Sequence, residues 1–383
     1  MIPKERVLAA MNHREPDRVP IVIGVSNATG IKMKAYRRLK DHLGIEAPDD
    51  YLYQWPELGT ALVDEDTLQC LGVDVRGVRD LESLSVREKN RKRPPGSPYL
   101  TSWGTGQVEI EDGVWYPGIH PLQEAVTIEE LEDHDWPDMD DPTRVAHVGE
   151  RARKLAEENN YAVMGTPWLL FPLERAFGLQ GMDAFLFNLA AYPDFARALL
   201  EKNLEMCKGL MGHFLREVGD YLDIIKIGDD LGTQESLLMS PEMYREILKP
   251  IHAELIAFIK ERTAAKVFFH TDGDVFPLLP DFIEIGIEIL NPIQTSAGKM
   301  ADLEKLTREF GDQLVFCGGI DTHHYLPDGT PEEVEAEVKR VIEVLGPGGG
   351  YLLSAVHTIM DDVPPENILA MVDAVEKYGR YPL

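Results

Sequence analysis

A histidine and two acids directly follow a short apolar run in the second half of the chain. Residues 266–270 read Lys-Val-Phe-Phe-His, and His270 is followed by Asp272 and Asp274 on either side of Gly273. A strand that ends abruptly in ligand-type residues is typical of an active site at the strand's carboxyl end. His270 and Asp272 are two residues apart, so on an extended backbone they point to the same side and could share one metal ion or one substrate. The alternative is a buried histidine beside a turn in which Asp-Gly only supplies a positive φ.

Short apolar runs of this kind alternate with helical patterns along most of the chain, and they are the predicted strands. They cover residues 21–25, 161–165, 222–227, 266–269, 287–290, 313–317 and 350–354, with 71–75 as a candidate eighth. Strands that alternate with helices indicate βα units and a parallel sheet.

The predicted fold is an α/β barrel of the (β/α)₈ (TIM) type. A doubly wound open sheet would normally carry a phosphate-binding glycine fingerprint near its first strand, and none is present in the sequence. Nearly every predicted strand instead ends in glycine or polar residues, as in a barrel. We expect a single barrel domain over residues 1–383, with an insertion at about 31–141 that contains β-hairpins within 99–116.

Composition narrows the class of partner. The chain has 383 residues, 44% of them hydrophobic, and a formal net charge of −28. Such an acidic surface repels nucleic acid phosphates and anionic lipid, so neither is an expected partner. No run approaches the roughly 20 apolar residues of a membrane span, and the N-terminus does not read as a signal segment. Three scattered cysteines do not make a disulfide framework, so a cytoplasmic location is expected.

Several motifs carry a family resemblance. Residues 6–20 (RVLAAMNHREPDRVP), 318–321 (GGID), 329–334 (GTPEEV), 348–351 (GGGY) and 364–367 (PPEN) resemble the uroporphyrinogen decarboxylase superfamily. That resemblance implies a (β/α)₈ barrel and one of two chemistries. One is cofactor-free decarboxylation of a porphyrinogen, and the other is zinc-assisted methyl transfer to or from a corrinoid (cobalamin) protein. A homodimer is a further expectation from the resemblance.

The resemblance also suggests a metal site. Corrinoid methyltransferases of the superfamily carry a His-x-Cys pair and a later cysteine, and the matching positions here resemble His270, Asp272 and His357. Three protein ligands with an open fourth position are the pattern of a catalytic zinc. Imidazoles and a carboxylate leave zinc a stronger Lewis acid than thiolates do, which favours an oxygen-linked methyl donor such as an aryl methyl ether. The sequence has no corrinoid-binding Asp-x-His-x-x-Gly motif, so a partner protein is expected to supply the corrinoid.

The decarboxylase is the alternative function. Uroporphyrinogen carries eight carboxylates, and similar decarboxylases place an arginine-rich loop after the first strand. The matching loop here, residues 26–31, has no basic residue, and the net charge of −28 disfavours a polyanion. Even so, His357 could equally resemble a histidine that decarboxylases keep without any metal. Asp272 could serve only to make the turn or to orient His270.

Other polar residues at predicted strand ends complete the candidate site. Asp229 and Asp230 are adjacent, so only one of them can face the barrel mouth. We expect Asp229 to act with His270 and His357 in catalysis and Asp230 to bind substrate. One of the two acids could instead be a fourth metal ligand, and the acid that does not face the mouth is expected to be a helix cap or a surface charge. The remaining expected substrate contacts are Asn27, Asn291, Gln294 and Gly319. Cys317 is expected in the core, and the pair His323–His324 on the surface.

Overall fold

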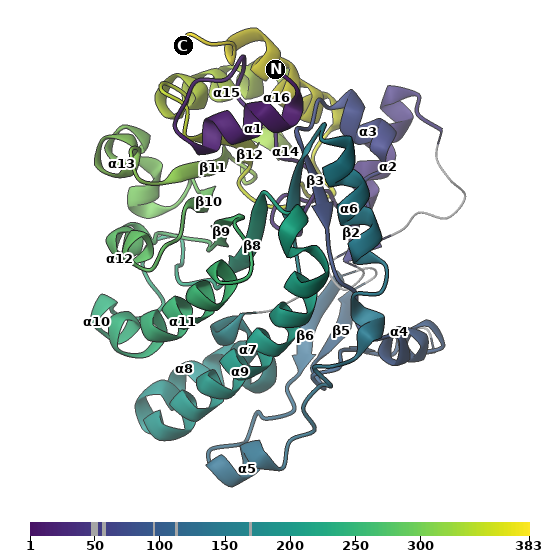
Figure 1. Cartoon of the computed structure of the whole chain (residues 1–383), viewed down its shortest axis with the longest axis vertical. Coiled ribbons are helices and arrows are strands. Elements are labelled where there is room, and N and C mark those ends of the chain that lie inside the picture. Colours follow the sequence, from purple (N-terminus) through teal and green to yellow (C-terminus); the bar gives the residue numbers. More distant parts are fainter. Residues whose placement is uncertain (47–52, 56–58, 95, 112–113, 168–170) are drawn as a thin grey trace.

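Seven parallel strands form the central sheet of the computed structural model, in the order β12-β11-β10-β9-β8-β7-β3. The structure describes residues 1–46, 53–55, 59–94, 96–111, 114–167 and 171–383. The strands are β3 (Val75–Val78), β7 (Ala162–Gly165), β8 (Ile224–Gly228), β9 (Lys266–His270), β10 (Ile289–Ile293), β11 (Val315–Ile320) and β12 (Tyr351–Ala355). These strands are almost entirely buried, as expected of parallel strands covered on both faces. The sheet curls around a common axis, so the predicted TIM-type barrel architecture is confirmed (Figure 1).

The predicted first strand, residues 21–25, occupies the gap between the two edges of the sheet. The Val22 N–H donates to the Leu353 carbonyl on β12 at 2.9 Å, and the Asp74 N–H, just before β3, donates to the Ile21 carbonyl at 3.0 Å. Regular pairing is limited to a single bridge between Ile21 and Leu353. This segment therefore lies in the eighth place of the barrel without forming a continuous ladder.

Two predicted strands are shifted along the chain. Residues 71–75 were expected to be a strand, but Leu71 caps the C-terminus of α3 (Glu65–Cys70), and β3 begins only at Val75. Asp74 therefore precedes its strand and does not end it. The strand predicted at 287–290 is β10, which begins at Ile289 and continues to Ile293, so Asn291 lies inside the sheet.

Helices surround the sheet and join successive strands (Figure 1). Besides α3 they are α1 (Pro3–Met11), α2 (Met33–Leu43), α4 (Leu84–Arg91), α5 (Ile128–Glu132), α6 (Val148–Glu158), α7 (Pro172–Gln180), α8 (Met182–Ala191), α9 (Pro193–Val218), α10 (Pro241–Met243), α11 (Lys249–Lys260), α12 (Leu279–Glu284), α13 (Leu303–Phe310), α14 (Tyr325–Asp328), α15 (Pro331–Leu345) and α16 (Pro365–Tyr378). Proline at the first turn begins α7, α9 and α15, where its missing N–H costs nothing. None of the described helices is both long and apolar enough to cross a bilayer.

The predicted insertion contains the expected β-structure. β4 (Tyr99–Leu100), β5 (Gly106–Glu111) and β6 (Val114–Ile119) form an antiparallel sheet of three strands, and β1 (Tyr53–Trp55) pairs with β2 (Thr60–Ala61). The residues after β6 pack on α7, since the Nδ1 of His120 lies 2.8 Å from the Gly178 carbonyl oxygen. The insertion thus supports the helix that follows β7.

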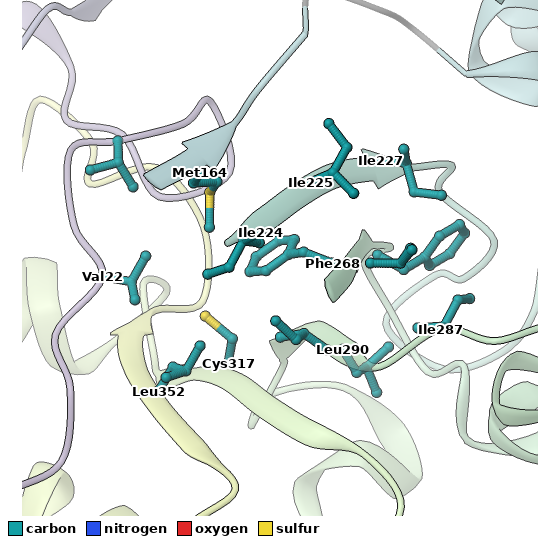
Figure 2. Packing of buried hydrophobic residues seen from close by; sticks show 14 of the residues in the cluster. Val22, Met164, Ile224, Ile225, Ile227, Phe268, Ile287, Leu290, Cys317 and Leu352 are labelled. Atoms are coloured by element: carbon teal, nitrogen blue, oxygen red, sulfur yellow. The ribbon is translucent and has the colours of Figure 1, made fainter. Parts of the chain in front are cut away.

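The barrel interior is apolar below the strand ends. Figure 2 shows side chains that converge inside the barrel, and they are Val22, Met164, Ile224, Cys317 and Leu352. Ile225 and Ile227 point to the opposite side of β8 and belong to the same hydrophobic core. Each of these residues is at most 2% exposed, so burial in the core, predicted for Cys317, is confirmed.

Candidate metal centre

Two histidines and an aspartate converge at the carboxyl ends of the strands. His270 ends β9, Asp272 lies in the following loop, and His357 follows β12. The Nε2 atom of His270 lies 3.8 Å from Oδ2 of Asp272, and the Nε2 atom of His357 lies 3.9 Å from the same oxygen. One ligand atom from each residue lies within 4.8 Å of the others. The curl of the sheet thus brings together residues that are separated by two intervening strands.

The orientation of His270 is set by a neighbour on β10. Its Nδ1 lies 2.7 Å from the side-chain oxygen of Asn291, while the Asn291 amide nitrogen donates to the Cys317 carbonyl at 3.4 Å. The second contact turns the amide oxygen toward the imidazole, so Nδ1 of His270 carries the proton. Its Nε2 lone pair is then free to face Asp272, the arrangement in which histidine binds a metal.

Both imidazoles are held in the neutral form. Burial lowers the pKa of His270 to about 4, and the positive charge of Lys226 adds to this effect. Burial also lowers the pKa of His357 to about 4, although the nearby Asp272 carboxylate opposes the shift. Neutral imidazole is the form that coordinates metal ions, so no proton has to leave before binding at neutral pH.

The Asp272 loop leaves one carboxylate oxygen without a partner. Oδ1 of Asp272 is buried and accepts no hydrogen bond within the described part of the chain. The loop itself is fixed, because the Asp272 N–H donates to Oδ1 of Asp230 at 3.0 Å and the Gly273 N–H donates to Oε1 of Gln294 at 2.7 Å. A buried carboxylate oxygen costs free energy unless a hydrogen bond or a cation satisfies it. Two imidazoles and one such carboxylate fit the donor set of a zinc ion.

The two adjacent acids after β8 have different environments. Asp229 accepts the backbone N–H groups of Leu173 and Glu174, at 3.1 Å and 2.8 Å, and thereby caps the first turn of α7. Its Oδ2 also lies 2.9 Å from Nε2 of His252. Asp230 points the other way and reaches the Asp272 loop. Asp230, not Asp229, is therefore the acid that the structure brings to the cluster, and the expected catalytic role of Asp229 stays a prediction.

A cavity of about 570 Å³ opens beside Asp272 and His357. Its other lining residues are Gly232, Thr233, Gln234, Gly273, Gln294, Thr322, His323, Val356, Thr358 and Met360. Gln294, expected to bind substrate, both lines this cavity and supports the Asp272 loop. His323 and His324 are exposed, as predicted.

Three of the predicted substrate contacts already have partners within the protein. The amide of Asn291 is used by His270 and Cys317. The space beside Gly319, an expected substrate contact, is filled by Val341, whose Cγ1 would lie 2.9 Å from an added Cβ. The backbone oxygen of Asn27 accepts the Thr358 hydroxyl, next to His357. Substrate contacts by these three residues remain predictions.

Two charged residues near the cluster were not predicted from the sequence. Lys226 is 7% exposed and alternates along β8 with the inward-pointing Ile224, which places its side chain inside the barrel. Glu174 lies in the first turn of α7. Both interact electrostatically with Asp230 and Asp272. A lone lysine in an otherwise apolar strand was the available signal for Lys226, whereas Glu174 had no local signal.

Comparisons with known proteins agree with this architecture. The family model for uroporphyrinogen decarboxylase (URO-D) matches residues 104–378. A uroporphyrinogen decarboxylase of Pelodictyon phaeoclathratiforme is 23% identical over 387 residues, which cover 98% of each chain. The methylcobamide:CoM methyltransferase MtbA of Methanosarcina mazei is 21% identical over 380 residues, again 98% of each chain. A solved methyltransferase from Methanosarcina mazei superposes with a TM-score of 0.63 at 22% identity, over 99% of both chains.

The barrel and the polar cluster at its mouth define a class of α/β-barrel proteins whose chemistry lies at the strand ends. Within that class the chain belongs to the uroporphyrinogen decarboxylase family. Its relatives include decarboxylases and a methyltransferase that acts on a methylcobamide, so the resemblance stated from the sequence is confirmed.

Proposed function

We propose that the protein is a zinc-dependent methyltransferase. It would move a methyl group from an oxygen-linked donor, such as a methyl ether, to the cobalt of a separate corrinoid protein. The observation that carries this proposal is the convergence of His270, Asp272 and His357 at the barrel mouth. The full-length likeness to the methyltransferase MtbA supports the reaction class.

His270, Asp272 and His357 are the residues that would hold the metal. When bound there, zinc supplies Lewis acidity, which polarises the donor oxygen and stabilises the negative charge that develops as the methyl group leaves. Two imidazoles and a carboxylate quench that acidity less than thiolates do, which favours a hard oxygen donor over a sulfur one. The ligand set therefore argues for cleavage of an oxygen–methyl bond.

The rest of the site positions these ligands and the donor. Asn291 holds the proton of His270 on Nδ1, and Gln294 holds the Asp272 loop through the Gly273 N–H. The cavity of about 570 Å³ is large enough for a small methyl ether. Its hydroxyl and amide side chains can orient the polar groups of such a donor.

The lining of the same cavity gives less support to the alternative function, decarboxylation of a porphyrinogen. A substrate with eight carboxylates needs cationic side chains, and the described lining residues include neither lysine nor arginine. Lys226 is committed to a group of carboxylates, namely Glu174, Asp230 and Asp272. The cavity therefore suits a neutral donor better than a polyanion.

Metal content and methyl transfer test the proposal together. We expect the purified wild-type protein to bind about one zinc ion per chain in elemental analysis, and the variants His270→Ala, Asp272→Asn and His357→Ala to lose it. With zinc loaded, the wild-type protein should methylate free cob(I)alamin from at least one of a panel of methyl ethers. Each variant should lose this activity.

His323→Ala is the matched control, because His323 lines the same cavity but lies outside the ligand set. It should keep its zinc. Wild-type protein that binds no zinc, or that decarboxylates a porphyrinogen without any metal, would contradict the proposed function.

A further inference from the structure

The loop after β8 and the loop after β9 are joined to each other at the barrel mouth. Four hydrogen bonds connect them, two donated in each direction. They run from the Asp229 N–H to the His270 carbonyl (3.1 Å), from the Leu231 N–H to the Thr271 hydroxyl (3.1 Å), from the Asp272 N–H to Oδ1 of Asp230 (3.0 Å) and from the Asp274 N–H to the Thr233 carbonyl (2.8 Å). A Cβ added at Gly232 would lie 2.8 Å from the Asp272 carbonyl oxygen, so the two loops also touch. The position of the β8 loop therefore sets the position of Asp272.

His252 holds the β8 loop from the layer of helices outside the barrel. It lies on α11 and is 2% exposed. Its Nε2 lies 2.9 Å from Oδ2 of Asp229, the first residue of that loop. The Asp229 carboxylate also accepts two backbone N–H groups from the first turn of α7, so it acts as an acceptor and Nε2 of His252 is the donor. His252 thus completes the contacts that anchor the start of the β8 loop.

The same imidazole packs against β9. The rings of His252 and Phe269 meet edge to face, with their centroids 5.5 Å apart. Successive side chains of a strand point to opposite faces, so Phe269 faces the helices while the next residue, His270, faces the barrel interior. His252 therefore contacts each strand at the residue immediately before a member of the polar cluster, which is Asp230 after β8 and His270 on β9.

Tyr244 fixes the orientation of this imidazole. Its hydroxyl lies 3.3 Å from Nδ1 of His252, and both side chains are buried. Burial raises the pKa of Tyr244 far above its usual value, so the hydroxyl keeps a proton to donate to Nδ1. Tyr244 also begins a π-helical turn (Tyr244–Leu248) ahead of α11, and such turns occur frequently at functional sites. Tyr244, His252 and Asp229 thus form a buried chain of hydrogen bonds that leads to the β8 loop.

We propose that His252 is a positioning residue for the polar cluster at the barrel mouth. By holding Asp229 and Phe269, it fixes the alignment of the β8 loop with the β9 loop, and so the place of Asp272 relative to His270. The inference goes beyond the proposed function, because it concerns the geometry of the site whatever the site binds. A histidine that only filled the core would affect overall stability and not these two loops.

Two substitutions separate the contacts of His252. In His252→Gln the side-chain amide can reach Asp229 as Nε2 does, whereas in His252→Asn the shorter amide stays near Tyr244 and leaves Asp229 without this donor. Hydrogen–deuterium exchange of the metal-free protein, measured by mass spectrometry, reports on the N–H groups of residues 229–234 and 271–275. We expect exchange in both segments to be about tenfold faster in His252→Asn than in the wild type, and near the wild-type rate in His252→Gln.

Zinc affinity is the second measurement, since the displaced loop carries the proposed ligand Asp272. His252→Asn should raise the zinc dissociation constant about 2–30-fold, and His252→Gln should restore most of the affinity. Asn367→Leu is the control for lost stability. The Asn367 amide is buried and donates to the carbonyls of Leu326 and Gly329, outside both loops. This variant should have a lower melting temperature but wild-type exchange in the two segments and wild-type zinc affinity.

Tyr244→Phe keeps the inference testable if His252→Asn does not fold. It removes only the hydroxyl that orients the imidazole, so exchange in the same two segments should rise by a smaller factor. Wild-type exchange there in a folded His252→Asn, or in Tyr244→Phe where His252→Asn does not fold, would overturn the inference. Equally fast exchange in His252→Asn and His252→Gln would also overturn it. Wild-type protein that binds no zinc would overturn the proposed function alone, because the exchange experiment needs no metal.

Discussion

The Nδ1 atom of His270 lies 2.7 Å from the side-chain oxygen of Asn291, which occupies the paired position on the neighbouring strand. The hydrogen bond fixes which imidazole nitrogen carries the proton, and so which one faces Asp272 and His357. Such outer contacts orient metal-binding histidines and raise their basicity. The pairing of β9 with β10 would therefore orient His270 in the proposed metal site before an ion binds.

Removing this acceptor should weaken metal binding without unfolding the barrel. We expect Asn291→Leu to raise the zinc dissociation constant about 10–100-fold, because the imidazole loses its fixed tautomer and orientation. Competition with a chromogenic chelator measures the constant. Asn291→Asp keeps an acceptor for Nδ1 and is the control. Equal zinc affinity in Asn291→Leu and the wild type would show that His270 is not a ligand oriented in this way.

Gly273 should be essential for the position of Asp272. Its φ is +91°, and an added Cβ would lie 2.5 Å from the Thr233 oxygen and would also collide with the carbonyl carbon of Gly232. Gly273→Ala should therefore push the loop away, lower the free energy of unfolding by about 1–3 kcal/mol and weaken zinc binding. Gly44→Ala is the control, since Gly44 has a φ of +66° but nothing within 4 Å of an added Cβ. Its substitution should leave zinc affinity unchanged.

The closure of the barrel depends on a buried ion cluster. Asp74 accepts Nη1 of Arg6 at 2.5 Å, Nη1 of Arg18 at 2.8 Å and the Ile21 N–H at 2.8 Å. Asp74→Ala would leave two buried guanidinium groups without their shared carboxylate. We expect a loss of about 3–5 kcal/mol in the free energy of unfolding, measured by urea denaturation.

The control variant changes Glu376, another ion-pair partner of Arg18. Glu376 pairs with the Arg18 Nε at 2.7 Å, but its side chain is half-exposed. Glu376→Gln should therefore cost at most about 1 kcal/mol. Similar losses in the two variants would mean that the buried cluster contributes no more than a surface ion pair.

Most of the residues that converge at the barrel mouth could be predicted from the sequence. In a parallel barrel all strands end at the same edge, so ligand-type residues after different strands meet whatever their separation in the chain. His270, Asp272 and His357 are near one another for this reason. The spacing of His270 and Asp272 after an apolar run predicted that pair, whereas His357 was added to it through the family resemblance.

Residues that are positioned by tertiary contacts could not be predicted from the sequence in the same way. The position of α7 decides which of the two adjacent acids faces the mouth. Asp229 faces α7, because the first turn of that helix lies against the end of β8. Glu174 is brought to the site by the same contact. Asn291 was expected after a strand, yet β10 continues through it and turns its amide to His270. Such contacts have no local signature in the sequence.

The pair of Lys40 and Asp64 should make stability depend on pH in the acid range. Burial alone would raise the pKa of Asp64, but hydrogen bonds from Lys40 and Thr67 outweigh it and lower the pKa to about 2. The folded form therefore binds this proton less readily than the unfolded chain, whose aspartate titrates near its ordinary value of 3.8. The stabilisation is present above about pH 4 and is lost as the pH falls toward 2. Asp64→Asn removes the titrating group, so its free energy of unfolding should fall less than that of the wild type between pH 6 and pH 3. Urea denaturation at the two pH values measures the difference, and parallel losses in both proteins would contradict the assignment.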